Sequence, residues 1–133
     1  MSTRITGAFE VKLSPQELVN KSADKTLGRF SLDKQFHGEL EAISKGEMLS
    51  AGTSVKGSAG YVAIERVTGT LQGHSGSFVL QHSGTMTRGV PGLIITVVPD
   101  SGTDQLTGLS GNMGINIVDG KHFYDFEYTI ENK

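Results

Sequence analysis

The chain has 133 residues, a length typical of one domain with a single hydrophobic core. It contains no cysteine, which excludes disulfides, thiolate catalysis and cysteine-ligated metal centres. Twelve basic and 14 acidic residues give a net charge of −2, which argues against a nucleic-acid or anionic-membrane footprint. Glycine occurs 18 times and proline only three times, a combination that suggests a β-rich fold with tight turns and bulges.

No segment has the apolar length of a signal peptide or of a membrane span. The longest strongly apolar run, residues 93–98, is far too short for either. We therefore expect a cytoplasmic protein without a membrane or nucleic-acid partner, and we treat residues 1–133 as a single domain.

The first predicted strand covers residues 5–13, where apolar and polar residues alternate with period two. A capping-box signature follows, with Ser14 as the N-cap, Pro15 at the first helical position and Glu17 three residues after the serine. This pattern predicts at most one short helical turn near residues 15–20, and no other segment has a helical pattern.

Seven further segments have strand patterns: residues 29–36, 39–49, 61–68, 77–87, 93–98, 106–118 and 121–130. In the first of these, Lys34 falls on the apolar side, and we place it at a rim from which its stem reaches solvent. In residues 93–98 both faces are apolar, so one apolar face must point outward. Either the turn after Ser14 or a second copy of the chain covers it, and we expect a homo-oligomer.

The Asp-Gly pair at residues 119–120 is a strong signal for a two-residue β-hairpin loop. With these two residues as the loop, Ile115 faces Tyr124 and Met113 faces Phe126. This register collects apolar and aromatic side chains on one face and mostly polar ones on the other, an agreement that a one-residue slip would destroy. We therefore expect these four side chains to point inward.

Eight mostly antiparallel strands with short turns favour closure into a barrel, because closure leaves no exposed strand edge. A barrel of eight strands has room for packed side chains or for one small ligand. The predicted fold is therefore all-β: a single closed antiparallel eight-stranded β-barrel.

Several segments resemble those of a known family. They are Gly57-Ser58-Ala59-Gly60-Tyr61, Glu65-Arg66, Gly76-Ser77-Phe78-Val79-Leu80-Gln81-His82, Val97-Val98-Pro99-Asp100-Ser101-Gly102-Thr103 and Asp119-Gly120-Lys121-His122. From about residue 9 to 128 the chain resembles a bacterial family of small proteins of unknown function, which is placed with the allene-oxide-cyclase-like β-barrels. The resemblance implies a barrel of that type. Allene oxide cyclases and the similar dirigent proteins steer a reactive ligand within a barrel cavity, but none of their catalytic residues is carried over to this chain.

The strand at residues 61–68 carries one charge on each face, so a regular strand aims either Glu65 or Arg66 into the barrel. We favour an inward Glu65, with Tyr61 on the same face. A carboxylate in an apolar cavity can serve as a general acid or base. The alternative is an outward Glu65 in a surface ion pair.

On the next strand His82 shares a face with Phe78 and Leu80, so we expect it to point into the barrel. Together with Glu65 it forms a candidate proton-transfer pair. The alternative is a core histidine whose ring is satisfied by a backbone carbonyl. The four histidines have neither a His-x-His nor a His-Glu-x-x-His spacing, so we predict no metal and no cofactor.

The leading functional hypothesis is the binding of a small apolar or amphipathic molecule inside the barrel. The ligand-binding residues that we predict are Tyr61, Phe78, Leu80, Met113, Ile115, His122, Tyr124 and Phe126. A second hypothesis is an isomerase or cyclase-like enzyme that uses Glu65 and His82. A third is a fully packed barrel that serves as a structural subunit of a homo-oligomer. The first two need a cavity of roughly a few hundred Å³, and the third needs none.

Overall fold

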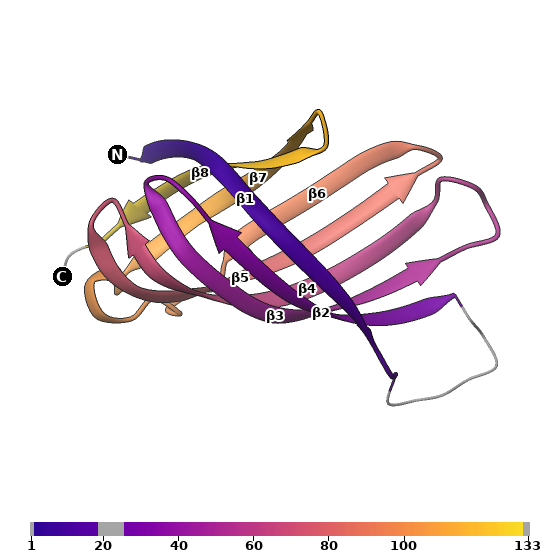
Figure 1. The fold of residues 1–133 in the computed structure, drawn as a ribbon, viewed down its shortest axis with the longest axis horizontal. Helices are drawn as coiled ribbons and strands as arrows, with labels where there is room; N and C mark the ends of the chain where they lie inside the picture. Colours follow the sequence, from indigo (N-terminus) through magenta and orange to yellow (C-terminus); the bar gives the residue numbers. More distant parts are fainter. Residues whose placement is uncertain (1, 19–25, 132–133) are drawn as a thin grey trace.

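The computed structural model describes residues 2–18 and 26–131 as one closed barrel of antiparallel strands (Figure 1). The strands follow chain order around the barrel, and the first closes on the last. They are β1 (Thr3–Gln16), β2 (Leu27–Phe36), β3 (Leu40–Gly52), β4 (Ala59–Leu71), β5 (His74–Thr87), β6 (Val90–Val97), β7 (Leu109–Val118) and β8 (Lys121–Ile130). The predicted all-β, eight-stranded antiparallel barrel is confirmed. In the described part of the chain, no helix is long and apolar enough to cross a membrane.

The helical turn predicted near residues 15–20 is wrong for the residues described there. Residues 14–16 continue β1 and pair with β2, while residues 19–20 lie outside the described part. Beyond Phe9, β1 has no pairing with β8, so Pro15 sits where the strand has a neighbour on one side only. Proline is tolerated at such an edge because no second ladder needs its missing N–H. Among described residues, the single helical turn is the 3₁₀ turn η1 (Asp104–Leu106).

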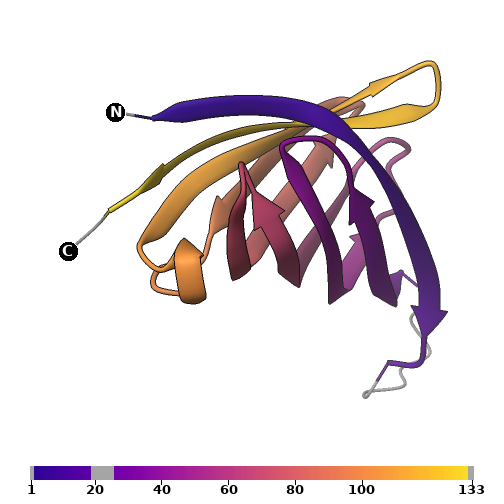
Figure 2. The same cartoon turned by 60° about the vertical axis from the view of Figure 1, so that its left-hand side comes forward.

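The barrel has two ends that differ in their connections. The end that we call the closed end carries both chain termini, the turns at residues 37–39 and 72–73, and the connection at residues 98–108 (Figure 1). The opposite end, the open end, carries the connections at residues 53–58, 88–89 and 119–120. Figure 2 shows the short helical turn of the 98–108 connection lying against the closed end. Leu106 of this turn is buried in the core.

Aromatic side chains fill the middle and the closed half of the barrel. Phe78 and Phe126 stack at 5.8 Å between ring centroids, and Phe36 meets Tyr124 edge-on at 5.7 Å. All four are essentially inaccessible to solvent. The predicted hairpin register is confirmed, since Met113 pairs with Phe126 and residue 115 pairs with Tyr124.

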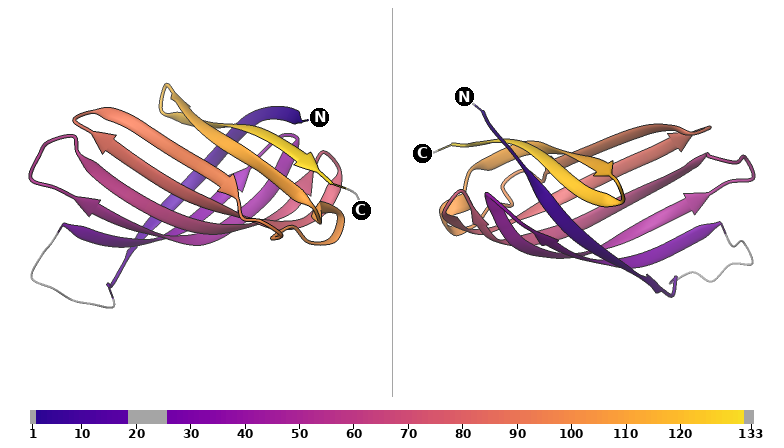
Figure 3. Two further views of the ribbon diagram at one scale, coloured as in Figure 1. Left: turned by 180° about the vertical axis from the view of Figure 1, so that it is seen from behind. Right: turned by 45° about the horizontal axis from the view of Figure 1, so that its top comes forward.

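The barrel wall is least complete between β6 and β7. These strands pair through Ile95 with Met113 and Thr96 with Asn112. Beyond these pairs the β5–β6 and β7–β8 hairpins diverge toward the open end (Figures 1 and 3). On β6, Ile95 points into the core whereas Ile94 is 66% exposed. Residues 14–16 form strand and not the expected turn, and Ile94 is exposed, so the described part of this segment does not cover the outer face.

Candidate functional site

A cluster of charged and polar side chains lies at mid-height inside the barrel. Glu65, on β4, points inward and is fully buried, whereas Arg66 points outward. The Nζ atom of Lys34 donates to Glu65 Oε2 at 2.8 Å, and Ser44 Oγ donates to Oε1 at 2.6 Å. The Nε2 atom of His82 lies 2.5 Å from the same Oε2 atom. Ser44 and His82 come from β3 and β5, the two strands that pair with β4, whereas Lys34 reaches across from β2, one strand further round the barrel.

The cluster holds Glu65 in its charged form. Burial by itself raises the pKa of Glu65, but the hydrogen bond with His82, the charge of Lys34 and the hydrogen bonds from Lys34 and Ser44 outweigh it. The pKa of Glu65 therefore falls from its ordinary value of 4.5 to about 2. Opposite Glu65 stands Gly46, where an added Cβ would overlap the Ile64 carbonyl and lie 2.8 Å from the Cβ of Glu65, so glycine lets β3 lie close against β4 at this point.

Lys34 is not at a rim, and the position that we predicted for it is wrong. It is 7% exposed, and its ammonium lies 5.2 Å from the centroid of the Phe9 ring and 5.7 Å from that of Phe36. The lysine stays inside because the buried carboxylate of Glu65 balances its charge. The sequence did carry a signal for this pairing: a lone lysine and a lone glutamate each fell on the apolar face of a strand.

Tyr61 extends the cluster toward the open end. Its hydroxyl lies 3.2 Å from Nδ1 of His82. Because Nε2 faces the ionised Glu65, a neutral imidazole carries its hydrogen there and accepts at Nδ1, so Tyr61 donates. Burial and the negative charge of Glu65 raise the pKa of Tyr61, which keeps the phenol protonated. Gly84 fixes the ring, since any Cβ at that position would overlap it.

An interior cavity of about 140 Å³ lies beside the cluster, in the half of the barrel nearer the open end. Its polar lining comes from four side chains: Lys34, Tyr61, His82 and His122. Its apolar walls are Phe9, Val11, Leu13, Leu32, Met48, Ala63 and Ile115. A cavity of about 150 Å³ holds a benzene-sized molecule. The space is thus smaller than the few hundred Å³ that the sequence argument called for.

The structure separates the eight predicted ligand-binding residues into two groups. Tyr61, Ile115 and His122 line the cavity. The other five lie in the packed core instead, away from the cavity walls: Phe78, Leu80, Met113, Tyr124 and Phe126. Alternation along a strand predicts which face a side chain takes, but it does not predict its height in the barrel. Among residues 2–18 and 26–131, no group of three or more His, Asp or Glu side chains is arranged to hold a metal ion.

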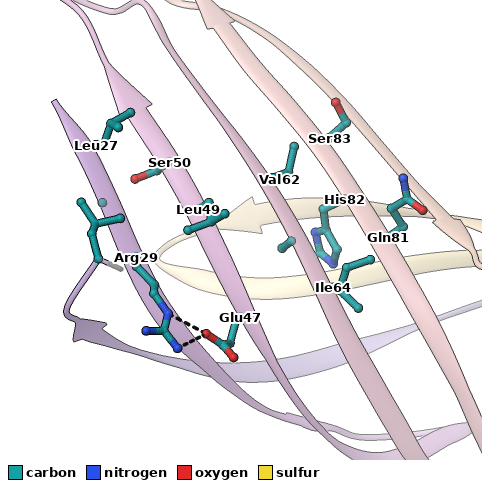
Figure 4. Close-up of a pocket in the computed structure, with 13 residues that line it drawn as sticks. Leu27, Arg29, Glu47, Leu49, Ser50, Val62, Ile64, Gln81, His82 and Ser83 are labelled. Atoms are coloured by element: carbon teal, nitrogen blue, oxygen red, sulfur yellow. Dashed lines mark hydrogen bonds and ion pairs between the residues drawn. The ribbon is translucent and has the colours of Figure 1, made fainter. Parts of the chain in front are cut away.

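A second hollow, of about 920 Å³, lies mainly on the outer face of β2 to β5 (Figure 4). We call it the outer groove. Leu49, Val62 and Ile64 give it an apolar surface, and each is about half exposed. The ion pair between Arg29 and Glu47, 2.6 Å long, lies along it. Ala63 and His82 line both the outer groove and the interior cavity, so the wall between the two hollows is thin at these residues.

Comparisons with known proteins agree with the barrel and assign no activity. A solved structure of a protein with unknown function from the DUF3224 family of Shewanella oneidensis MR-1 is 55% identical to this chain. The match covers 100% of both chains with a TM-score of 0.95, and its bacterial source agrees with the bacterial family that the sequence resembles. No curated protein matches the chain. The likeness to allene-oxide-cyclase-like barrels stays a prediction. The family model described as "Protein of unknown function (DUF3224)" matches residues 5–128, and the chain belongs to this family.

Proposed function

We propose that this protein binds a small amphipathic molecule in its interior cavity. The apolar body of the ligand packs against the walls near Ile115, and its polar end faces Lys34, Tyr61 and His82. The observation that carries the proposal is an apolar cavity that borders a buried, charged cluster. A largely apolar hollow with a few convergent polar groups is the usual form of a small-molecule site.

The energetics of the cluster support a binding role over a purely structural one. Burying Lys34 and Glu65 costs free energy of desolvation, and well-packed apolar residues in place of such a pair are often as stable or more stable. An ammonium has three N–H donors, and among the described residues Glu65 is the hydrogen-bond acceptor of Lys34. Lys34 lines the cavity, so in this proposal its remaining donors bind an oxygen atom of the ligand.

The size of the cavity limits the ligand. A volume of about 140 Å³ fits one six-membered ring or a short chain. A longer ligand would have to extend toward the open end, where β6 and β7 diverge.

Cyclohexanol, an amphipathic ring of suitable size, tests the proposal by methyl NMR titration. We expect shifts for the methyl groups of Ala63 and Ile115, and none for Leu40 and Leu71 at the closed end. Equal shifts at both ends, or none at Ile115, would contradict the proposal. Native mass spectrometry of the protein purified from its own host would further reveal a retained ligand.

Ile115→Phe should weaken cyclohexanol binding, because the larger side chain fills part of the cavity. Ile117→Phe is the matched control: it lies two residues further along β7, is 64% exposed and does not line the cavity. Equal binding by the two variants would argue against the cavity as the site.

The contact between His82 and Glu65 supports a second candidate, an isomerase or cyclase-like enzyme. The two functions share the cavity and differ in whether the bound molecule is changed. We also propose that copies of this chain associate with one another in the cytoplasm, since a single chain leaves the apolar residues of the outer groove exposed.

A further inference from the structure

We infer that Tyr61, His82 and Glu65 form a proton relay that enolises a small ketone in the cavity, while Lys34 binds the carbonyl oxygen. This inference rests on the proposed function, because the ketone must first occupy the cavity. It adds a substrate class, a carbonyl compound with an α-hydrogen, and it assigns roles to Tyr61 and Lys34 that the sequence argument did not give them.

The pairing of β4 with β5 places the three side chains of the relay next to one another. Tyr61 and Glu65 point the same way from β4, four residues apart, with Ala63 between them on the same face. Ala63 pairs with His82 of β5, so the imidazole stands between the phenol and the carboxylate. The two contacts are 3.2 Å from Tyr61 to His82 and 2.5 Å from His82 to Glu65.

The order of the three groups fits their chemistry. Tyr61 lines the cavity and can touch a ligand, whereas Glu65 is sealed behind the cluster. A hydroxyl, an imidazole and a buried carboxylate in sequence are the arrangement by which enzymes activate a weakly acidic hydroxyl. In this arrangement Glu65 is a positioning residue, because it acts through His82 and does not reach the ligand.

The proton transfer balances without any further reactant. The oxygen of Tyr61 takes a proton from the carbon next to the carbonyl, while the hydroxyl proton of Tyr61 passes to Nδ1 of His82. The electrons of the broken C–H bond form a C=C bond, and the carbonyl oxygen becomes an enolate oxygen. Lys34 stabilises that oxygen, and Glu65 stabilises the imidazolium. Reversal of these steps returns a proton to the carbon.

The charges of the cluster favour a neutral carbonyl compound over a carboxylate. Lys34 and the ionised Glu65 cancel one another. A carboxylate in the cavity would add a negative charge near Glu65, and among the described residues there is no second buried lysine or arginine to balance it, so its desolvation cost would be high. A ketone oxygen needs only the hydrogen-bond donors that Lys34 still has.

Cyclohexanone in D₂O provides the test, because enolisation replaces its α-hydrogens by deuterium. We expect the wild-type protein to accelerate the loss of the α-proton NMR signal over buffer. Tyr61→Phe should reduce this protein-dependent rate by about 10²-fold or more, while cyclohexanone still shifts the Ile115 methyl signal. Tyr128→Phe is the matched control and should keep the wild-type rate, since its hydroxyl contacts Gln72 at the closed end.

Gly84→Ala gives an independent variant that keeps every group of the relay. Its methyl group displaces the Tyr61 ring, so the exchange rate should fall although the phenol remains. A Tyr61→Phe protein as fast as wild type would overturn the relay. Binding of cyclohexanone without faster exchange would also overturn the relay and leave the binding proposal intact. If neither cyclohexanone nor cyclohexanol binds, the proposed function fails together with the relay.

Discussion

The closed half of the barrel and the half nearer the open end are built from the same strands, but their interiors are filled differently. In the closed half, the inward side chains of Phe36, Leu71, Phe78 and Phe126 exclude solvent almost completely. In the other half, a cavity remains and a charged cluster borders it. Both halves have the same alternation of inward and outward residues. The difference therefore lies in which side chains take the inward positions, and not in the backbone pattern.

The two halves also differ in what they contribute to stability. Apolar burial is the main favourable contribution to folding, and the closed half supplies much of it. The buried pair of Lys34 and Glu65 contributes little net stability, because desolvation offsets the attraction between the charges. Under the proposed function, the looser packing beside this pair leaves the space that the ligand occupies.

Truncation of the core aromatic residues should have the largest effect. Tyr124→Ala and Phe126→Ala should each lower the free energy of unfolding by about 3–5 kcal/mol, because both rings are fully buried. Asp125→Ala and Glu127→Ala, on the outward face of the same strand, should cost much less. Urea denaturation measures all four. A ranking in which the outward pair costs more would contradict the packing of β8.

Acidification should reduce the contribution of the charged cluster to the free energy of unfolding before it reduces the contribution of the closed half. The pKa of Glu65 is about 2 in the folded protein against an ordinary 4.5, so the carboxylate binds its proton more readily in the unfolded chain. Its stabilising contribution is therefore complete above pH 4.5 and is lost as the pH falls toward 2. The shift corresponds to about 3 kcal/mol relative to a protonated Glu65 in the same folded site, and not relative to an apolar replacement of the pair.

Urea denaturation at pH 7, 4 and 2 of wild type and Glu65→Gln checks this contribution. Glutamine keeps the shape but does not titrate, so the stability advantage of wild type should shrink on acidification. An advantage that stays constant over this range would mean that Glu65 has the same pKa in the folded and unfolded states.

Truncation at the cavity wall should have a smaller effect than truncation in the closed half. Ile115 is half-buried and already borders empty space, so Ile115→Ala should cost about 1 kcal/mol. Leu71→Ala, at a fully buried position near the closed end, should cost about 2–5 kcal/mol. Equal losses in urea denaturation would indicate that the two halves are packed to the same degree.

The sequence was sufficient for the barrel and for the facing of its strands. Alternation, β-branched composition and one continuous apolar run together located the eight strands, and the Asp-Gly turn fixed the register of β7 with β8. The same alternation correctly aimed Glu65 and His82 inward. These features depend on the local sequence pattern and on the residues of the turns, and short segments of the sequence determine both.

What the sequence could not supply is the height of each side chain in the barrel and its partner across the interior. Lys34 was placed at a rim because its contact with Glu65 joins residues 31 positions apart. For the same reason Phe78 and Phe126 were grouped with Tyr61 as cavity residues. The capping box after β1 failed because pairing with β2 outweighed a local helical signal.

Substitutions in the outer groove should have the smallest effect on the free energy of unfolding and the clearest effect on self-association. Leu49 and Val62 pair with each other in the groove, and the exposed Ile94 continues their line beyond it, since Val62 and Ile94 both pair with Ser83 of β5. Arg29 and Glu47 beside this line balance each other in an ion pair, so a second copy of this chain would meet an apolar surface without a net local charge. Val62→Lys should therefore leave stability nearly unchanged and reduce self-association in sedimentation velocity at micromolar concentration. Ile117→Lys, outside the groove, is the control, and a wild-type protein that sediments only as a monomer would remove the argument.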